Sequence, residues 1–141
     1  MQLDWSDFRK VATMSLREYA KVNVDITDPN IADLIETIYV WFDCDQKPLR
    51  VGTRTAKLGS RLLEYAKHIN RSLAGHEKPT PRWEAEAWLQ QLRHGTLHAL
   101  AYQPDVILTP FGEIRPYLDI ERVLIRQLKA AGLAQLNRSH R

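Results

Sequence analysis

The residues best placed to do chemistry lie in and around a strongly basic segment, residues 50–82. This segment carries eight Lys and Arg residues against two Glu residues, a net charge of +6, whereas residues 1–49 carry −4 and residues 83–141 carry +1. A basic block suits a polyanion such as nucleic acid, because phosphate contacts and counterion release supply most of the affinity. The alternative is a solvated helix face without such a partner.

Five polar side chains lie where the predicted elements would let them converge. Arg61 and Tyr65 are four residues apart in a helical segment, so they share one face of that helix. Tyr39 lies in the middle of a predicted strand, Glu121 in the last predicted helix, and Asn137 near the C-terminus. Their convergence would bring a cation, two phenols, a carboxylate and an amide into one site.

Each of these side chains also has an ordinary structural explanation. A tyrosine inside a strand is usually a packing residue, and Arg61 could pair with Glu64 or Glu77. The helix dipole favours a carboxylate such as Glu121 near a helix N-terminus, without any catalysis. Asn137 could cap the chain after the last helix. The residue types alone therefore leave both explanations open.

Hydrophobic periodicity and turn residues predict the elements that position these side chains. A first helix of about 15 residues begins at Asp4 or Ser6, and a short helix begins at Asp28-Pro29. Two strands, at about 37–43 and 48–52, form a tight antiparallel pair. The remaining elements are a helix after residue 52, a helix between residues 80 and 95, a strand within 96–103, an ordered loop over 104–116 and a helix from 117.

This order predicts a small α+β fold in which helices flank a three-stranded antiparallel sheet. Residues 1–35 would form an extra N-terminal helical extension, and residues 36–141 the main domain. A chain of 141 residues is long enough for one modest core. Its single cysteine, Cys44, excludes an internal disulfide, and we find neither a membrane-spanning apolar run nor a signal peptide. We therefore expect a cytoplasmic protein.

From about residue 36 to 137, these segments resemble the GIY-YIG endonucleases, in the order that the family has them. The first strand supplies "TIY" (37–39) and the second supplies "RVG" (50–52). The following helix carries Arg61 and, four residues on, the aromatic Tyr65. The last helix reads "ERVLI", beginning at Glu121, and the closing "LN" ends at Asn137. Residues 36–141 would then be a GIY-YIG-like nuclease domain.

The resemblance implies a metal-dependent endonuclease that hydrolyses DNA phosphodiester bonds. Glu121 would hold one Mg²⁺ or Mn²⁺ ion, and Arg61 would counter the charge that develops on the phosphate. Tyr39 would be the general base, provided that nearby cations or the metal lower its pKa. Tyr65 would position Tyr39 or the attacking water. Asn137 would form hydrogen bonds to residues of the site without touching the substrate.

The sequence departs from the family pattern at several positions. Thr37 replaces a glycine, Arg50 replaces the tyrosine of "YIG", and the spacings from residue 52 to 61 and from 121 to 137 are longer than usual. Arg50 is either an added phosphate clamp in an active enzyme, the mark of a centre that binds without cleaving, or a sign that the strand register differs. The sequence keeps the other functional residues of the family, which favours the active enzyme; these are Tyr39, Arg61, Glu121 and Asn137.

The basic side chains expected to bind the DNA are Arg50, Arg54, Lys57, Lys67 and Arg71. The acidic N-terminal helices are a candidate surface for a homodimer. Two other functions remain open: a nucleic-acid-binding module of the same fold without cleavage, and an unrelated α+β interaction domain. In the last case, Tyr39, Arg61 and Glu121 would not converge.

Overall fold

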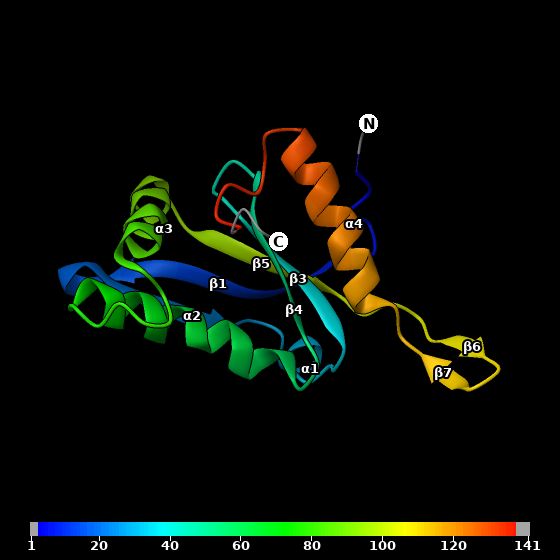
Figure 1. Cartoon of the computed structure of the whole chain (residues 1–141). Helices are drawn as coiled ribbons and strands as arrows, with labels where there is room; N and C mark the ends of the chain where they lie inside the picture. Colours follow the sequence, from blue (N-terminus) through cyan, green and yellow to red (C-terminus); the bar gives the residue numbers. More distant parts are fainter. Residues whose placement is uncertain (1–2, 138–141) are drawn as a thin grey trace.

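The structure, a computed structural model, describes residues 3–137 and contains a five-stranded antiparallel sheet with helices on both faces (Figure 1). The strand order in this sheet is β2-β1-β5-β3-β4. The elements are β1 (Arg9–Arg17), η1 (Glu18–Ala20), β2 (Lys21–Ile26), α1 (Pro29–Ala32), β3 (Thr37–Phe42), β4 (Pro48–Arg54), α2 (Leu58–Leu73), α3 (Arg82–His94), β5 (Leu97–Tyr102), β6 (Ile107–Thr109), β7 (Gly112–Ile114) and α4 (Tyr117–Ala130). No helix among the described residues is long and apolar enough to cross a membrane.

The predicted elements from residue 28 to 102 are confirmed, and local chemistry explains their ends. The Asp28 carboxylate accepts hydrogen bonds from the backbone N–H groups of Asn30 and Ile31, which caps α1. Strands β3 and β4 pair antiparallel, and Asp43 orders the turn between them by accepting two backbone N–H bonds. Helix α3 ends at Gly95, as the sequence predicts. The last predicted helix is confirmed as α4.

Strand β3 is buried on both faces and therefore separates two hydrophobic cores. Its odd-numbered residues, Tyr39 and Trp41, lie in the core that α2 and α3 cover. Its even-numbered residues, such as Ile38 and Val40, lie in the core that α4 covers. The alternation of side chains along a strand thus assigns Tyr39 to the α2 and α3 face of the sheet.

The predicted N-terminal helix is wrong, and the sheet has five strands rather than three. Residues 9–17 form β1, which pairs with β2 on one side and with β5 on the other. Met14 is buried between the half-buried Thr13 and Ser15, so the period here is two. The aromatic residues that suggest a helix pack elsewhere: Trp5 lies 5.1 Å from Phe42, between ring centroids. A separate unit beginning at residue 36 stays a prediction.

The segment 104–116, predicted as an ordered loop, contains a second, two-stranded sheet formed by β6 and β7. Gly112 has a φ of +127°, which favours glycine and suits the turn between the strands. The Thr109 hydroxyl donates a hydrogen bond to the Gly112 carbonyl and closes this turn. The hairpin projects from the body beside the start of α4 (Figure 1).

Candidate active site

The site begins with Tyr39, whose ring passes directly over Gly52 of the neighbouring strand. These two residues are partners in the β3–β4 register. A Cβ atom added at Gly52 would lie 2.3 Å from the Tyr39 hydroxyl oxygen and 2.4 Å from its Cζ. The glycine of "RVG" is therefore required so that the phenol of "TIY" can cross the strand.

A methyl group at this position should displace the phenol, so we expect Gly52→Ala to destabilise the fold. Overpacking of this kind costs about 1–3 kcal/mol, measurable by urea unfolding. Gly59→Ala is the matched control, because its Cβ would meet only the Ala32 side chain and backbone, at 3.2 Å or more. If Gly52→Ala were no less stable than Gly59→Ala, the close approach of Tyr39 to the strand would be contradicted.

Tyr39, Arg61 and Tyr65 are brought together at one point. The hydroxyl groups of Tyr39 and Tyr65 share a hydrogen bond of 2.7 Å, and Arg61 Nε donates to the Tyr39 hydroxyl at 3.2 Å. Arg61 also pairs with Glu64 at 3.3 Å, so the structural explanation and the site explanation both apply to it. This contact brings together two of the three residues, Tyr39, Arg61 and Glu121, whose convergence would distinguish a nuclease site from a chance match.

Tyr39 is fully buried, and this sets its protonation. Burial raises the pKa of Tyr39 well above its ordinary value, and the neighbouring Tyr65 acts in the same direction. Arg61 lowers the pKa of Tyr39 but does not offset the burial. Tyr39 is therefore a neutral phenol at neutral pH, and Arg61 alone does not make it a base.

Arg50, at the position of the missing tyrosine, is held in a buried network. Its Nη1 donates to the Leu136 carbonyl at 3.0 Å and lies 3.5 Å from a Glu84 carboxylate oxygen on α3. The two side chains are only 8% and 4% exposed. The guanidinium carbon also lies 5.9 Å from the centre of the Tyr65 ring, within cation–π range. Arg50 therefore joins the sheet, α3 and the tyrosine pair.

Asn137 supports the site through the backbone of β4. Its side-chain amide accepts from the Val51 N–H at 2.8 Å and donates to the Val51 carbonyl at 2.9 Å. Two further backbone bonds tie the segment before it to Pro48 and Leu49. This segment thus covers the edge of β4 up to Val51, and it presents the carbonyl that accepts from Arg50.

A pocket of about 140 Å³ opens beside these groups, lined by Arg50, Arg61, Tyr65, His68, Pro79, Thr80 and Glu84. Sequence reasoning missed four of these residues, two of which, His68 and Glu84, are titratable. His68 is seven residues after Arg61, a spacing that returns to the same helix face and was a usable signal. Glu84 had no such signal, because only the packing of α3 against α2 brings it to Arg50.

His68 is a neutral group of this pocket at neutral pH. Partial burial lowers its pKa below the ordinary value of 6.5, and the charges of Arg61, Lys67 and Arg71 act in the same direction, against Glu64. The positive charge in the pocket therefore comes from its two arginines.

Glu121 lies on the other side of β4 and does not line this pocket. It belongs to the buried face of α4, with Tyr117 four residues before it and Ile125 four residues after it. The Tyr117 hydroxyl bonds Thr55 just beyond β4 at 2.7 Å, and Ile125 packs in the same core as Val51. Helix geometry therefore places Glu121 alongside β4 between those two points, close to the stretch that contains Gly52.

A metal ion held by protein ligands alone does not fit these residues. Within residues 3–137, no group of three or more His, Cys, Asp or Glu side chains could hold one. A Mg²⁺ ion that keeps most of its waters and binds together with a phosphate needs only one or two carboxylates. Glu121 is the carboxylate that the resemblance selects for such a site, but it is only 8% exposed and does not line the pocket.

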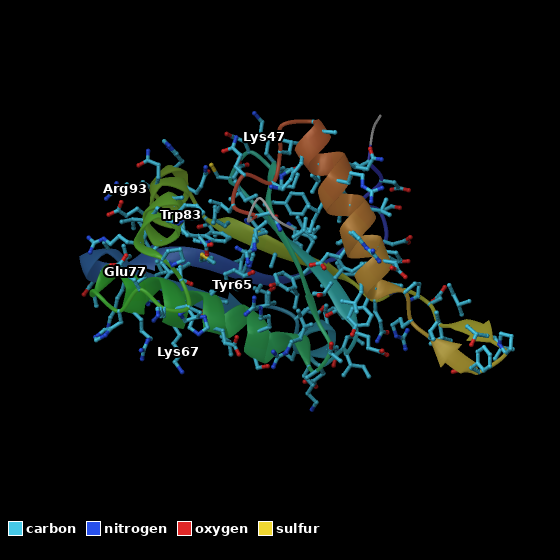
Figure 2. The ribbon with its side chains drawn as sticks, viewed as in Figure 1. Lys47, Tyr65, Lys67, Glu77, Trp83 and Arg93 are labelled. Atoms are coloured by element: carbon cyan, nitrogen blue, oxygen red, sulfur yellow. The ribbon has the colours of Figure 1, made fainter. Side chains whose placement is uncertain are left out.

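The other predicted DNA-binding residues lie outside the pocket. Arg54 donates to the Ser60 hydroxyl at 3.2 Å, and Lys57 lies 4.0 Å from Asp33. Lys67 points away from the pocket, on the side of α2 opposite Tyr65 (Figure 2). A DNA duplex that reaches the pocket would therefore not touch all of the predicted basic residues with the same face.

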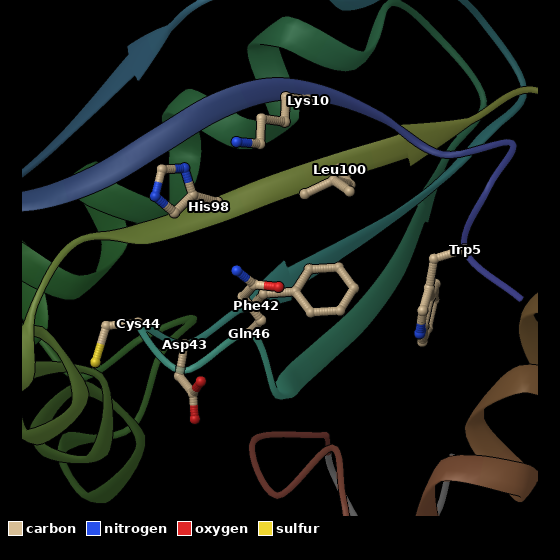
Figure 3. Close-up of a pocket in the computed structure, with 8 residues that line it drawn as sticks. All are labelled: Trp5, Lys10, Phe42, Asp43, Cys44, Gln46, His98 and Leu100. Carbon is tan, nitrogen blue, oxygen red and sulfur yellow. The ribbon is translucent and has the colours of Figure 1, made fainter. Parts of the chain in front are cut away.

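A larger pocket, of about 350 Å³, is separate from the candidate site. It lies on the α4 side of the sheet (Figure 3), and its lining includes Trp5, Phe42, His98 and Leu100. None of the predicted catalytic residues contributes to it. We assign the chemistry to the smaller pocket, because Tyr65 and the two arginines line it and Tyr39 is hydrogen-bonded to Tyr65 directly behind them.

The overall fold is similar to that of known nucleases. A glutamate-to-alanine mutant of bacteriophage T4 EndoII matches with a TM-score of 0.57 and 13% sequence identity, over 86% of this chain and 88% of that chain. The restriction endonuclease HPY188I, in complex with product DNA, matches with a TM-score of 0.51 and 12% identity, over 87% of this chain and 74% of that chain. No protein-family model and no curated protein matches the sequence. The chain therefore shares its fold with these two proteins, and identities this low show the fold alone.

Proposed function

We propose that this protein is a metal-dependent DNA endonuclease of the GIY-YIG type. The observation that carries the proposal is the contact of Tyr39 with both Arg61 and Tyr65 above Gly52. Four residues that the family resemblance selects from three separate segments thus meet at one point. The similarity of the fold to two nucleases supports the same conclusion.

The two arginines of the pocket would bind the scissile phosphate. Arg61 is half-buried and presents a planar fork that suits phosphoryl oxygens. Arg50 contributes a second positive charge from the floor of the pocket, where Glu84 and the Leu136 carbonyl hold it. Donors fixed in this way need little reorganisation as charge develops on the phosphate.

Tyr39 would orient the attacking water and accept its proton. Because burial raises the pKa of this phenol, proton transfer to it requires that its own proton is first lost. That proton would have to leave the pair of phenols to solvent, and the Tyr65 hydroxyl would then donate its hydrogen bond to the Tyr39 phenolate. Glu121 would hold Mg²⁺ or Mn²⁺, and this ion, when bound, would polarise the phosphate and stabilise the leaving oxygen.

The proposal is tested by cleavage of supercoiled plasmid, single-stranded circles and a branched oligonucleotide in Mg²⁺ or Mn²⁺. We expect metal-dependent cleavage that falls at least about 100-fold in Glu121→Gln, with DNA binding retained. The matched control is Glu113→Gln, because Glu113 is an exposed carboxylate on β7, away from the pocket.

Two outcomes would contradict the endonuclease. Salt-sensitive DNA binding without cleavage of any substrate would favour the binding module of the same fold. Neither binding nor cleavage would favour an interaction domain that shares only the fold. If Glu121→Gln cleaved DNA as fast as the wild type, Glu121 would not be a metal ligand. The roles proposed for the other residues would be unaffected.

A further inference from the structure

Trp83, the second residue of α3, is a large aromatic side chain that the fold leaves in solvent. It is 57% exposed, and neither hydrophobic core includes it. Trp88, five residues further along the same helix, is fully buried. Its ring centroid lies 6.3 Å from that of Trp41 and 5.5 Å from that of Tyr65. Packing therefore explains Trp88 and does not explain Trp83.

Trp83 borders the candidate active site. Thr80, three residues before it, and Glu84, directly after it, both line the pocket of about 140 Å³. Glu84 also lies 3.5 Å from Arg50, which contributes positive charge to this pocket. Consecutive side chains of a helix are about 100° apart around its axis, so Trp83 lies beside the flank that carries Glu84. Figure 2 shows Trp83 on the flank of α3 nearer to Tyr65. Trp83 is thus a residue of the pocket's rim.

The first turn of α3, which carries this indole, is fixed to its surroundings. The Glu77 carboxylate accepts a hydrogen bond from the Arg82 backbone N–H at 3.1 Å, which satisfies one of the open donors at this end of the helix. The Arg82 side chain pairs with Glu86 at 3.0 Å. The buried Trp88 holds the following turn against the core. The indole of Trp83 is therefore attached to a rigid element beside the pocket.

An exposed indole next to two guanidinium groups suits a nucleotide of a nucleic acid. Cationic side chains bind the phosphate, and an aromatic ring stacks on the face of the base, whatever its identity. In a regular duplex, each base is paired and stacked between its neighbours, so its face is not available to a protein ring. A base that is single-stranded, mismatched or turned out of the helix can stack on such a ring.

We propose that Trp83 stacks on an unpaired DNA base next to the phosphate that Arg50 and Arg61 bind, so that the site prefers single-stranded or distorted DNA to regular duplex. This inference rests on the proposed function, because it takes the pocket as the phosphate site. A protein partner would also cover an exposed tryptophan. The two arginines of the adjoining pocket and the net charge of +6 over residues 50–82 favour a polyanion instead.

The proposal is tested by fluorescence anisotropy with a labelled single-stranded oligonucleotide and its duplex, in EDTA so that neither is cleaved. Trp83→Leu keeps an apolar side chain without a ring, and we expect its Kd for single-stranded DNA to rise at least about fivefold, with duplex binding unchanged. Trp83→Phe keeps a ring and should bind more like the wild type. The matched control is Leu63→Ala, because Leu63 is 47% exposed on α2 and does not line the pocket.

The intrinsic fluorescence of the protein gives a second readout. Single-stranded DNA should quench the tryptophan emission of the wild type and not that of Trp83→Phe. Trp41 and Trp88 are fully buried, and Trp5 packs in the core on the α4 side of the sheet. The quenching by DNA therefore reports on Trp83.

Several outcomes would overturn the proposal. One is single-stranded DNA binding by Trp83→Leu that equals that of the wild type, and another is an equal loss for single strand and duplex. A wild-type chain that self-associates and dissociates in Trp83→Leu, with DNA binding unchanged, would assign Trp83 to a protein contact. A wild type that prefers single-stranded DNA through Trp83 but does not cleave it would contradict the endonuclease alone.

Discussion

Replacing Tyr39 by phenylalanine should lower the rate of DNA cleavage about 100-fold or more, the usual contribution of a positioned acid or base. The change removes one hydroxyl and keeps the ring that lies over Gly52. It also leaves Arg61 Nε and the Tyr65 hydroxyl without their shared partner. We therefore expect a loss of about 1–3 kcal/mol of stability from the unpaired buried groups, and a fold that remains intact.

The matched control is Tyr117→Phe. The Tyr117 hydroxyl makes a hydrogen bond to Thr55 at 2.7 Å, whereas the Tyr39 hydroxyl makes two, and Tyr117 does not line the pocket. Single-turnover cleavage and urea unfolding of both variants separate chemistry from stability. We expect both variants to lose stability, and only Tyr39→Phe to lose cleavage. Full cleavage by Tyr39→Phe would remove this phenol from the reaction.

The pH dependence of the same two proteins gives an independent measure of the Tyr39 hydroxyl. Because burial raises the pKa of Tyr39, the fraction of phenolate, and with it the wild-type cleavage rate, should rise across the neutral and mildly alkaline range. The folded state binds the phenolic proton more tightly than the unfolded state. This contribution to stability is therefore full below the unfolded pKa of about 10 and is lost as the pH rises above it. Tyr39→Phe should reduce both effects.

The parts of the site that were predictable from sequence depend on local geometry. Arg61 and Tyr65 share a helix face by spacing, and the β3–β4 pair is short enough that its register follows from its turn. Tyr39 and Gly52 are partners in that register. The contact between the strand tyrosine and the helix arginine then follows once α2 packs on the sheet.

The parts that were not predictable depend on packing between distant segments. The apolar residues between Trp5 and Leu16 fit both a helical and an alternating period. The chain forms a strand here because it pairs with β2 and β5. Arg50 looked like a lost tyrosine because its partner, Glu84, is 34 residues away in sequence. The β6–β7 hairpin was expected as a loop, because its segment contains three prolines and a glycine.

The second large predicted effect is the loss of stability when the buried Arg50–Glu84 ion pair is broken. Glu84→Gln removes the negative partner of a buried guanidinium, and breaking a buried ion pair on one side costs about 3–5 kcal/mol. Glu86→Gln is the matched control, because Glu86 lies on the same helix and pairs with Arg82 at 3.0 Å, but on the surface. An exposed pair of this kind contributes about 0–1 kcal/mol. Equal stability losses in the two variants, by urea unfolding, would contradict the buried network.

A double variant, Arg50→Met with Glu84→Leu, separates the structural role of this pair from its role in DNA binding. Replacing both members of a buried ion pair by apolar side chains is often neutral for stability or stabilising, so most of the loss in Glu84→Gln should be recovered. The phosphate contact of Arg50 is not recovered, and we expect weaker DNA binding with a salt slope smaller by about one. If the stable double variant bound DNA like the wild type, Arg50 would be a structural residue only. Arg50, at the family's tyrosine position, would then stabilise the packing of the fold and would not bind phosphate.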